Sequence, residues 1–205
     1  VSSLGKYIPG KVWAIAGIAV MARERGVAAW AATGAAILNQ GLAVLAGAVV
    51  VGATGTSLLR GNWPWIDRLL LVLVVGGVAG LALLLSPSLV RRVLGWFRIA
   101  STGQPTPGAG SVVIAALANI VAWTGYGISL WLLARGVLAA SPSLKACIAA
   151  FTASYIAGLI AVIAPAGIGV RESVFILMLQ GAIGVPAAAA LAIASRLMLT
   201  ATEVG

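Results

Sequence analysis

The sequence predicts an all-α fold: a polytopic integral membrane bundle, with some helices broken or re-entrant, in a single domain over residues 1–205. Three observations support this prediction. The chain is 61% hydrophobic and 8% charged, whereas soluble domains carry about 25% charged residues, and its mean hydropathy is +1.11. Its Lys and Arg residues lie scattered between long apolar runs. One apolar run is interrupted by Pro and Gly where a helix should be crossing lipid.

The composition also excludes several classes of function. Thirteen Lys and Arg against 4 Asp and Glu give a net charge of +9, but scattered cations suit membrane-flanking loops and anionic headgroups, so we expect no nucleic-acid partner. The chain has no His and 1 Cys. His-based catalysis, an internal disulfide and a Cys-rich zinc site are therefore excluded. We expect no cofactor and no metal site.

A short apolar segment, residues 12–22, lies near the start of the chain between Lys11 and Arg23. A helix that spans a bilayer needs about 20 apolar residues, so this segment is too short to cross. It follows Pro9 and Gly10, and we predict a re-entrant or half-helix after this pair. The core of a signal peptide is the alternative, although a Pro-Gly pair in the basic region ahead of the core argues against it.

Longer apolar runs follow, from which we expect about five full spans and one or two re-entrant segments. The predicted spans are residues 27–51, 69–85, 111–134, 144–164 and 186–204, with a shorter helix at 173–183. Gly76 and Gly80 lie four residues apart in the second span, a spacing that allows close helix packing but also recurs by chance. Cys147 lies in the fourth span, where we expect it to serve packing.

Asn39 and Gln40 lie in the middle of the first predicted span. A polar side chain at this depth can hydrogen-bond to a neighbouring helix, an interaction worth about 0.6 kcal/mol on average. It can also line a polar pathway for a substrate. Both interpretations stay open, and we count Asn39 and Gln40 among the candidate substrate-binding residues.

Residues 88–99 have an apolar and a basic face at helical spacing. The apolar face comprises Leu89, Val90, Val93, Leu94 and Phe97, and the basic face comprises Arg91, Arg92 and Arg98. This pattern predicts an amphipathic helix that lies in the membrane interface. A basic loop that only sets the topology is the alternative.

The positions of Lys and Arg predict the orientation, because cytoplasmic loops are enriched in them. The larger group would lie on one side of the membrane: Lys6, Lys11, Arg23, Arg25, Arg91, Arg92 and Arg98. The smaller group would lie on the other side: Arg60, Arg68, Arg135 and Lys145. We therefore predict that the side of residues 88–99 is cytoplasmic.

The uncharged run at residues 146–170 contains Pro165, Gly167 and Gly169 and then meets the adjacent pair Arg171-Glu172. Irregular backbone at membrane depth is tolerated only where it is buried in protein or lines a wet cavity. Ionisable groups there are candidates for function, and exposed N–H groups at the start of a half-helix attract anions. An ordinary loop with a self-neutralising ion pair is the alternative.

Arg196 lies between an Ala-rich stretch and Leu197-Met198-Leu199. An Arg at the centre of a membrane helix costs roughly 2.5–3.5 kcal/mol, so a partner acid or a polar cavity must offset this cost. Glu172 and Glu203 are the nearby acids in the sequence. The alternative is that Arg196 extends its guanidinium to the membrane surface.

Two motifs together resemble a known family. The stretches Gly5-Lys-Tyr-Ile-Pro-Gly-Lys-Val-Trp13 and Ala164-Pro-Ala-Gly-Ile-Gly-Val-Arg-Glu172, the second followed by Ser195-Arg196-Leu197, resemble the lysylphosphatidylglycerol synthase/flippase transmembrane family, also called the flippase-like domain. Trp123-Thr-Gly-Tyr-Gly127 is similar to the Trp/Gly span between the motifs. The resemblance covers essentially the whole chain, and its Pro-x-Gly-x-Gly-Val-Arg-Glu stretch is the most specific part.

The resemblance implies a multi-pass protein of the plasma membrane that moves a phospholipid or lipid-linked headgroup, such as aminoacylated phosphatidylglycerol, between leaflets. It implies no enzymatic activity. The motif positions are occupied here by Pro9, Gly10, Pro165, Gly167, Gly169, Arg171, Glu172 and Arg196. We expect a polar groove at the Pro-Gly breaks, in which the two Arg residues bind phosphate and Glu172 orients Arg171 or meets a cationic headgroup. The implied partners are membrane lipids, further copies of the chain and a fused or separate lipid-modifying enzyme.

The chain departs from the family pattern in three places. An acid often lies where Asn39-Gln40 stands here, so a proton-coupled role at that position is in doubt. The helices that usually precede the first motif are missing, and we expect the chain to be the C-terminal two-thirds of a longer domain. The soluble aminoacyl-transferase domain of some members is also missing, which leaves no basis for synthase activity. A membrane enzyme acting on lipid-linked substrates and a non-transporting scaffold in envelope assembly are the alternatives.

Overall fold

The computed structural model describes residues 21, 29–55, 64–96, 108–161 and 167–204. Within these ranges the ordered elements are α-helices, with no strand, as the sequence predicts. The helices are α2 (Ala29–Thr54), α4 (Pro64–Leu84), α5 (Pro87–Trp96), α6 (Ala109–Val137), α7 (Leu144–Ile160), α8 (Val170–Ile183) and α9 (Val185–Val204). Pro9, Gly10 and nearly all of the predicted half-helix at 12–22 lie outside the described residues.

Among the described residues, two helices are long and apolar enough to cross a membrane, judged by length and composition. They are Ala32–Thr54 within α2 and Ala109–Val137, which is α6. The other predicted spans give shorter apolar helices, Leu71–Leu84, Leu144–Ile160 and Val185–Ala201. At 1.5 Å per residue, the 17 residues of α7 span about 25 Å, less than the roughly 30 Å of a hydrocarbon core.

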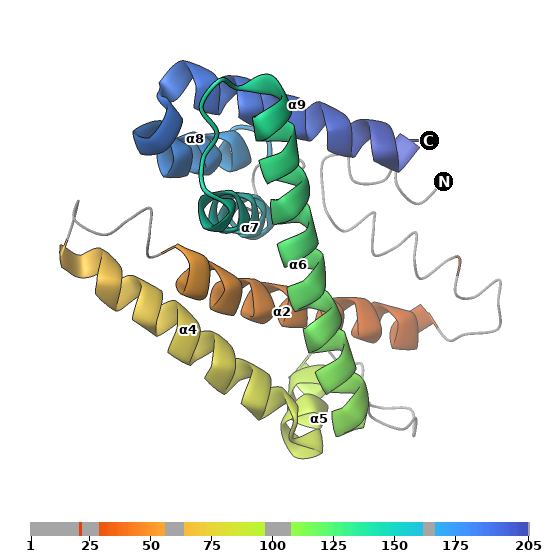
Figure 1. Ribbon diagram of the computed structural model, residues 1–205. Helices are drawn as coiled ribbons and strands as arrows, with labels where there is room; N and C mark the ends of the chain where they lie inside the picture. The colour runs from red at the N-terminus through yellow and green to blue at the C-terminus, as the bar shows by residue number, and fades with distance from the viewer. Residues whose placement is uncertain (1–20, 22–28, 56–63, 97–107, 162–166, 205) are drawn as a thin grey trace.

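Helix α7 lies at the centre and packs against α2, α6 and α8. Figure 1 shows α6 running from α5 at one end to α8 and α9 at the other, and α2 crosses α6 between them. Helices α2 and α4 lie side by side, and α8 turns back on α9. The break predicted after residue 164 is therefore the connection between the central helix and the α8–α9 pair.

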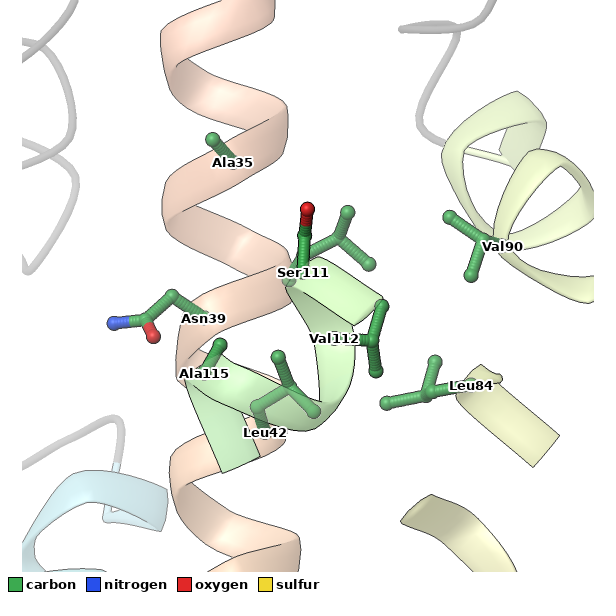
Figure 2. A pocket seen from close by; sticks show the side chains of 9 residues that line it. Ala35, Asn39, Leu42, Leu84, Val90, Ser111, Val112 and Ala115 are labelled. Carbon is green, nitrogen blue, oxygen red and sulfur yellow. The ribbon is translucent and has the colours of Figure 1, made fainter. Parts of the chain in front are cut away.

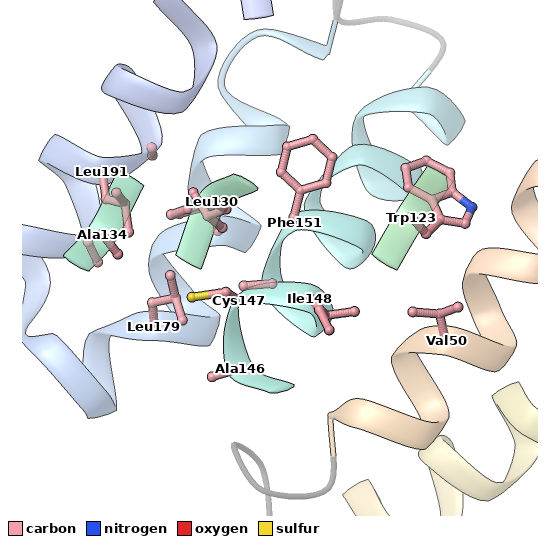
Figure 3. Packing of buried hydrophobic residues seen from close by; sticks show 14 of the residues in the cluster. Val50, Trp123, Leu130, Ala134, Ala146, Cys147, Ile148, Phe151, Leu179 and Leu191 are labelled. Atoms are coloured by element: carbon pink, nitrogen blue, oxygen red, sulfur yellow. The ribbon is translucent and has the colours of Figure 1, made fainter. Parts of the chain in front are cut away.

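The core surrounds α7. Figure 3 shows Trp123 and Leu130 of α6, Phe151 of α7 and Leu179 of α8 among its buried side chains. Cys147 is fully buried, which confirms its predicted role in packing. The indole N–H of Trp123 donates a hydrogen bond to the carbonyl oxygen of Ala43 at 3.0 Å, so α6 is tied to α2 by a polar contact as well.

Glycine allows the close approach of α4 to α2, but in a different register from the predicted one. A Cβ on Gly77 would lie 2.9 Å from the carbonyl oxygen of Leu45, and one on Gly80 would also meet the Leu45 side chain. A Cβ on Gly76 would meet nothing within 4 Å. The prediction of a Gly76–Gly80 packing face is therefore wrong for Gly76, because the face of α4 that meets α2 lies one residue further along the helix.

The contact between α6 and α7 generates a stability prediction. A Cβ on Gly127 would lie 2.5 Å from the Cα of Ile148, whereas one on Gly125 would meet nothing within 4 Å. We expect Gly127→Ala to lower the free energy of unfolding by about 1–3 kcal/mol, because the overpacked backbone must move. Gly125→Ala, on the same helix, should leave it unchanged or slightly raised. Denaturant unfolding in detergent micelles measures both, and equal effects would contradict this packing.

Candidate functional site

The turn that precedes α8 is built from glycine. Gly167 has φ of +69° and Gly169 has φ of +85°, a region that side chains with a Cβ rarely adopt. A Cβ on Gly167 would lie 2.7 Å from the Cα of Gly158 on α7, so the turn touches the α7 backbone directly. Pro165 lies outside the described residues. The motif glycines thus fix the start of α8 against the last turn of α7.

Glu172 connects this turn to α9. Its Oε2 atom accepts a hydrogen bond from the Gly169 backbone N–H at 2.7 Å, which satisfies a donor left unpaired at the start of the helix. Its Oε1 atom accepts a hydrogen bond from Nη1 of Arg196 and forms an ion pair with it. The partner acid of Arg196 is therefore Glu172, one of the two acids that the sequence offers.

The ion pair is partly sheltered, since the Arg196 side chain is 26% exposed and that of Glu172 is 23% exposed. A pair with this exposure keeps contact with the surroundings, so a charged ligand can reach and compete for either partner. Removal of one partner would leave the other charge without compensation in a poorly solvated place. The pair is therefore both a structural link and a place where charge is accessible.

Arg171 lies against aromatic rings of α7. Its guanidinium carbon lies 4.7 Å from the ring centre of Tyr155 and 5.3 Å from that of Phe151. Stacking of this kind uses the face of the guanidinium group, whereas its N–H donors point outward in the plane of the group. The two rings of α7 thus hold the guanidinium of Arg171 at the start of α8.

The aromatic contacts continue into α6. The ring centres of Trp123 and Tyr155 are 5.2 Å apart in an edge-on arrangement, and those of Tyr126 and Phe151 are 5.2 Å apart in a stacked one. Sequence reasoning missed Phe151 and Tyr155 as part of the site. Their spacing was a usable signal, because positions i and i+4 lie on one face of a helix, and Gly158 follows on that face.

The structure divides the predicted site residues into two groups. Gly167, Gly169, Arg171, Glu172 and Arg196 come together at the start of α8 and its contact with α9. Asn39 and Gln40 lie on α2, which packs against α4, α6 and α7. Helix α7 packs against both α2 and α8 and so lies between the two groups, and a shared role in binding a substrate stays a prediction.

Asn39 accepts a hydrogen bond from the side chain of Asn119 on α6, at 3.4 Å. It also lines a cavity that Figure 2 shows between α2, the start of α6 and α5. Gln40 is exposed on α2. Within the described ranges, no three Cys, Asp or Glu side chains lie close enough together to hold a metal ion.

The two motif glycines differ in a way that generates a prediction. At Gly169 a Cβ would meet nothing within 4 Å, so Gly169→Ala carries only the strain of a positive φ, about 1–3 kcal/mol. At Gly167 the same strain is joined by the clash with Gly158. We expect Gly167→Ala to lower the midpoint of thermal unfolding more than Gly169→Ala. Thermal scans of both variants in one detergent test this order, and the reverse order would contradict the turn geometry.

A second prediction separates the two roles of Glu172. Glu172→Gln keeps an oxygen that can accept the Gly169 N–H but loses the charge, whereas Glu172→Ala loses both, so the Ala variant should be less stable. Glu172→Ala and Arg196→Ala should show a coupling energy of about 0.5–3 kcal/mol in a double-mutant cycle. Gln180→Ala, exposed on the same helix, is the matched control and should not couple. Additive effects of the Glu172 and Arg196 variants would contradict the ion pair.

In comparisons with protein-family models, with curated proteins and with solved structures, the chain finds no match. The resemblance described under the sequence therefore stays a prediction. The chain's own residues that indicate a function are the partly sheltered Glu172–Arg196 pair and Arg171, which is adjacent to Glu172 in the sequence.

Proposed function

We propose that this chain is a polytopic integral membrane protein of the plasma membrane that moves a phospholipid or lipid-linked headgroup between leaflets, as a flippase-like protein. The observation that carries the proposal is the Glu172–Arg196 ion pair beside an interrupted helix. The chain has only 4 acidic residues, and one of them forms this pair. Placing ionisable groups between apolar helices in a membrane costs free energy, and such groups mark pathways for polar substrates.

The distribution of exposed apolar side chains supports the membrane setting. Large apolar residues lie exposed on α4, on α6 and on α9, among them Leu71, Val72, Ile114, Val121, Ile193 and Leu197. In water, each square ångström of such surface costs about 25 cal/mol relative to burial, and monomeric soluble proteins rarely expose large apolar patches. Lipid removes this cost. The exposed apolar surface therefore supports a membrane setting for α4 and α9 as well as for the two helices that have the length of a full span.

The charges suggest how a headgroup would bind. Arg171 is oriented by Tyr155 and Phe151, and its fork of donors matches phosphate oxygens. A phosphate that also engages Arg196 competes with Glu172 for it. Glu172 is then available to accept the ammonium group of a headgroup that carries both charges, such as an aminoacylated phospholipid. After the exchange the phosphate contacts both Arg residues and the ammonium group contacts Glu172, so each charged group of the site has a partner of opposite charge.

This role for Glu172 differs in one respect from the expected one. The resemblance implies that Glu172 orients Arg171 or meets a cationic headgroup, whereas its carboxylate in the structure pairs with Arg196 and with the Gly169 N–H. In the proposal, α7 orients Arg171 and Glu172 orients Arg196. Nothing in this arrangement requires bond breaking in the lipid, and we propose transport without catalysis. Association with further copies of the chain or with a lipid-modifying enzyme remains a prediction of the resemblance.

The proposal is tested by lipid translocation in proteoliposomes that contain the purified chain and a headgroup-accessible fluorescent phospholipid. We expect Arg171→Ala/Arg196→Ala to slow translocation by about tenfold or more, which corresponds to about 1.4 kcal/mol of lost binding in the transition state. Arg135→Ala is the matched control, because Arg135 also stacks on an aromatic ring, Trp131 at 4.8 Å, but at the end of α6. It should translocate at the wild-type rate.

Two outcomes of this assay would overturn the proposal. One is a wild-type chain that moves neither anionic nor aminoacylated lipid faster than empty liposomes. The other is a double variant that keeps the wild-type rate after its fold has been verified by circular dichroism. Single variants at Arg171 and Arg196 then show which guanidinium contributes more to translocation.

A further inference from the structure

A second site lies at the start of α6. It is a cavity of about 200 Å³ that opens between α2, α4, α5 and the first turns of α6. Its walls are mostly aliphatic, with Leu38, Leu42, Leu84, Val90 and Val112 among the lining side chains. Figure 2 shows Leu84 of α4 and Val90 of α5 facing Val112 across it. Figure 1 shows that α5 lies at the end of α6 opposite α8 and α9.

The walls determine what can fill the interior. A polar or charged group would lose its hydration there without gaining hydrogen bonds, and a buried water needs two to four polar partners. Among the described residues that line the cavity, the polar side chains are those of Asn39 and Ser111, and both are exposed. A closed aliphatic cavity of about 150 Å³ takes up benzene, so this one has room for part of a hydrocarbon chain.

The charged residues near the cavity determine which headgroup a bound molecule could place outside it. Val90 of α5 is buried and lines the cavity, whereas Arg92 of the same helix is exposed, and Arg91 lies between them in the sequence. Helices α2, α5 and α6 carry no acidic residue. The acid of α4, Asp67, lies in the first turn of that helix, far along it from Leu84. Within the described helices, α5 therefore contributes a positive charge beside the cavity, and α2 and α6 contribute no acid that would offset it.

We propose that this cavity binds one acyl chain of an anionic phospholipid whose headgroup lies on α5. The same short helix supplies an apolar wall and a positive charge, as an amphiphile with a negative headgroup requires, and amphipathic basic helices lie at the level of anionic headgroups. The site is separate from the Glu172–Arg196 pair. It rests on the membrane setting of the proposed function but not on translocation.

The site is tested on the full chain, purified in detergent and stripped of lipid. Phosphatidylglycerol or phosphatidylcholine with matched acyl chains is added, and native mass spectrometry measures the bound lipid. We expect phosphatidylglycerol to bind at about tenfold lower concentration. Arg92→Gln should bring its affinity close to that of phosphatidylcholine, whereas Arg135→Gln, an exposed Arg at the other end of α6, should leave the preference intact. Equal effects of the two variants would overturn the headgroup assignment.

The acyl-chain part is tested by filling the cavity. Ala115 lines it, and Ala115→Phe should weaken binding of both lipids about tenfold. Ala118→Phe, at an exposed position of the same helix, is the matched control and should bind as the wild type does. Unchanged binding to the Ala115→Phe variant would overturn the cavity as the acyl-chain site.

A third measurement needs no variant and is independent of how well Ala115→Phe folds. Phosphatidylglycerol with a photoreactive acyl chain should crosslink to peptides of α2, α5 or α6 that line the cavity. Crosslinks confined to α8 and α9, or none, would overturn the proposal. Arg171→Ala/Arg196→Ala should still bind phosphatidylglycerol at α5 even where translocation is lost. Failure of the lipid site and failure of the transport proposal are therefore distinguishable.

Discussion

The arrangement of α8 and α9 depends on two contacts of the Glu172 carboxylate. One oxygen accepts the Gly169 N–H and so fixes where α8 begins, and the other holds Arg196 of α9. An ion pair that is largely removed from solvent adds little net stability, because desolvation offsets the attraction. Its effect is on geometry instead: the two contacts join α9 to the start of α8, where the turn lies against Gly158 of α7. Position, more than stability, is what this side chain provides.

Small residues give α7 its central place. Cβ atoms on Gly47 of α2 and Gly127 of α6 would collide with Ile156 and Ile148 of α7, and Gly158 of α7 itself receives the turn at Gly167. Because helices approach most closely where side chains are smallest, three neighbours contact the same short helix. This crowding has a functional consequence. It separates Asn39 on α2 from Glu172 on α8, so the two candidate polar positions lie on opposite sides of α7.

The sequence predicted what depends on local pattern. The lengths of apolar runs placed α2, α6 and α7, the two-faced pattern placed α5 within a few residues, and Pro and Gly marked the break before α8. The rotation of each helix about its axis and the residues that it contacts were harder to predict. A shift of one residue turns a helix face by about 100°, so Gly77 rather than Gly76 meets α2. The contact of Arg171 with Tyr155 and the cavity that Asn39 lines together with Val90 of α5 depend on tertiary packing, which no single run of sequence records.

The two proposed lipid sites differ in how readily each would release a bound lipid. At α5, binding would come from burial of hydrocarbon, worth about 0.8 kcal/mol per CH₂, together with a fixed positive charge that no acid on α2, α5 or α6 neutralises. Such a site retains its lipid. At α8 and α9, Arg196 already has Glu172 as a partner, so a headgroup gains only the difference between its own contacts and the ion pair that it displaces. A small difference in free energy means rapid exchange, and rapid exchange is what a site that passes lipids onward requires.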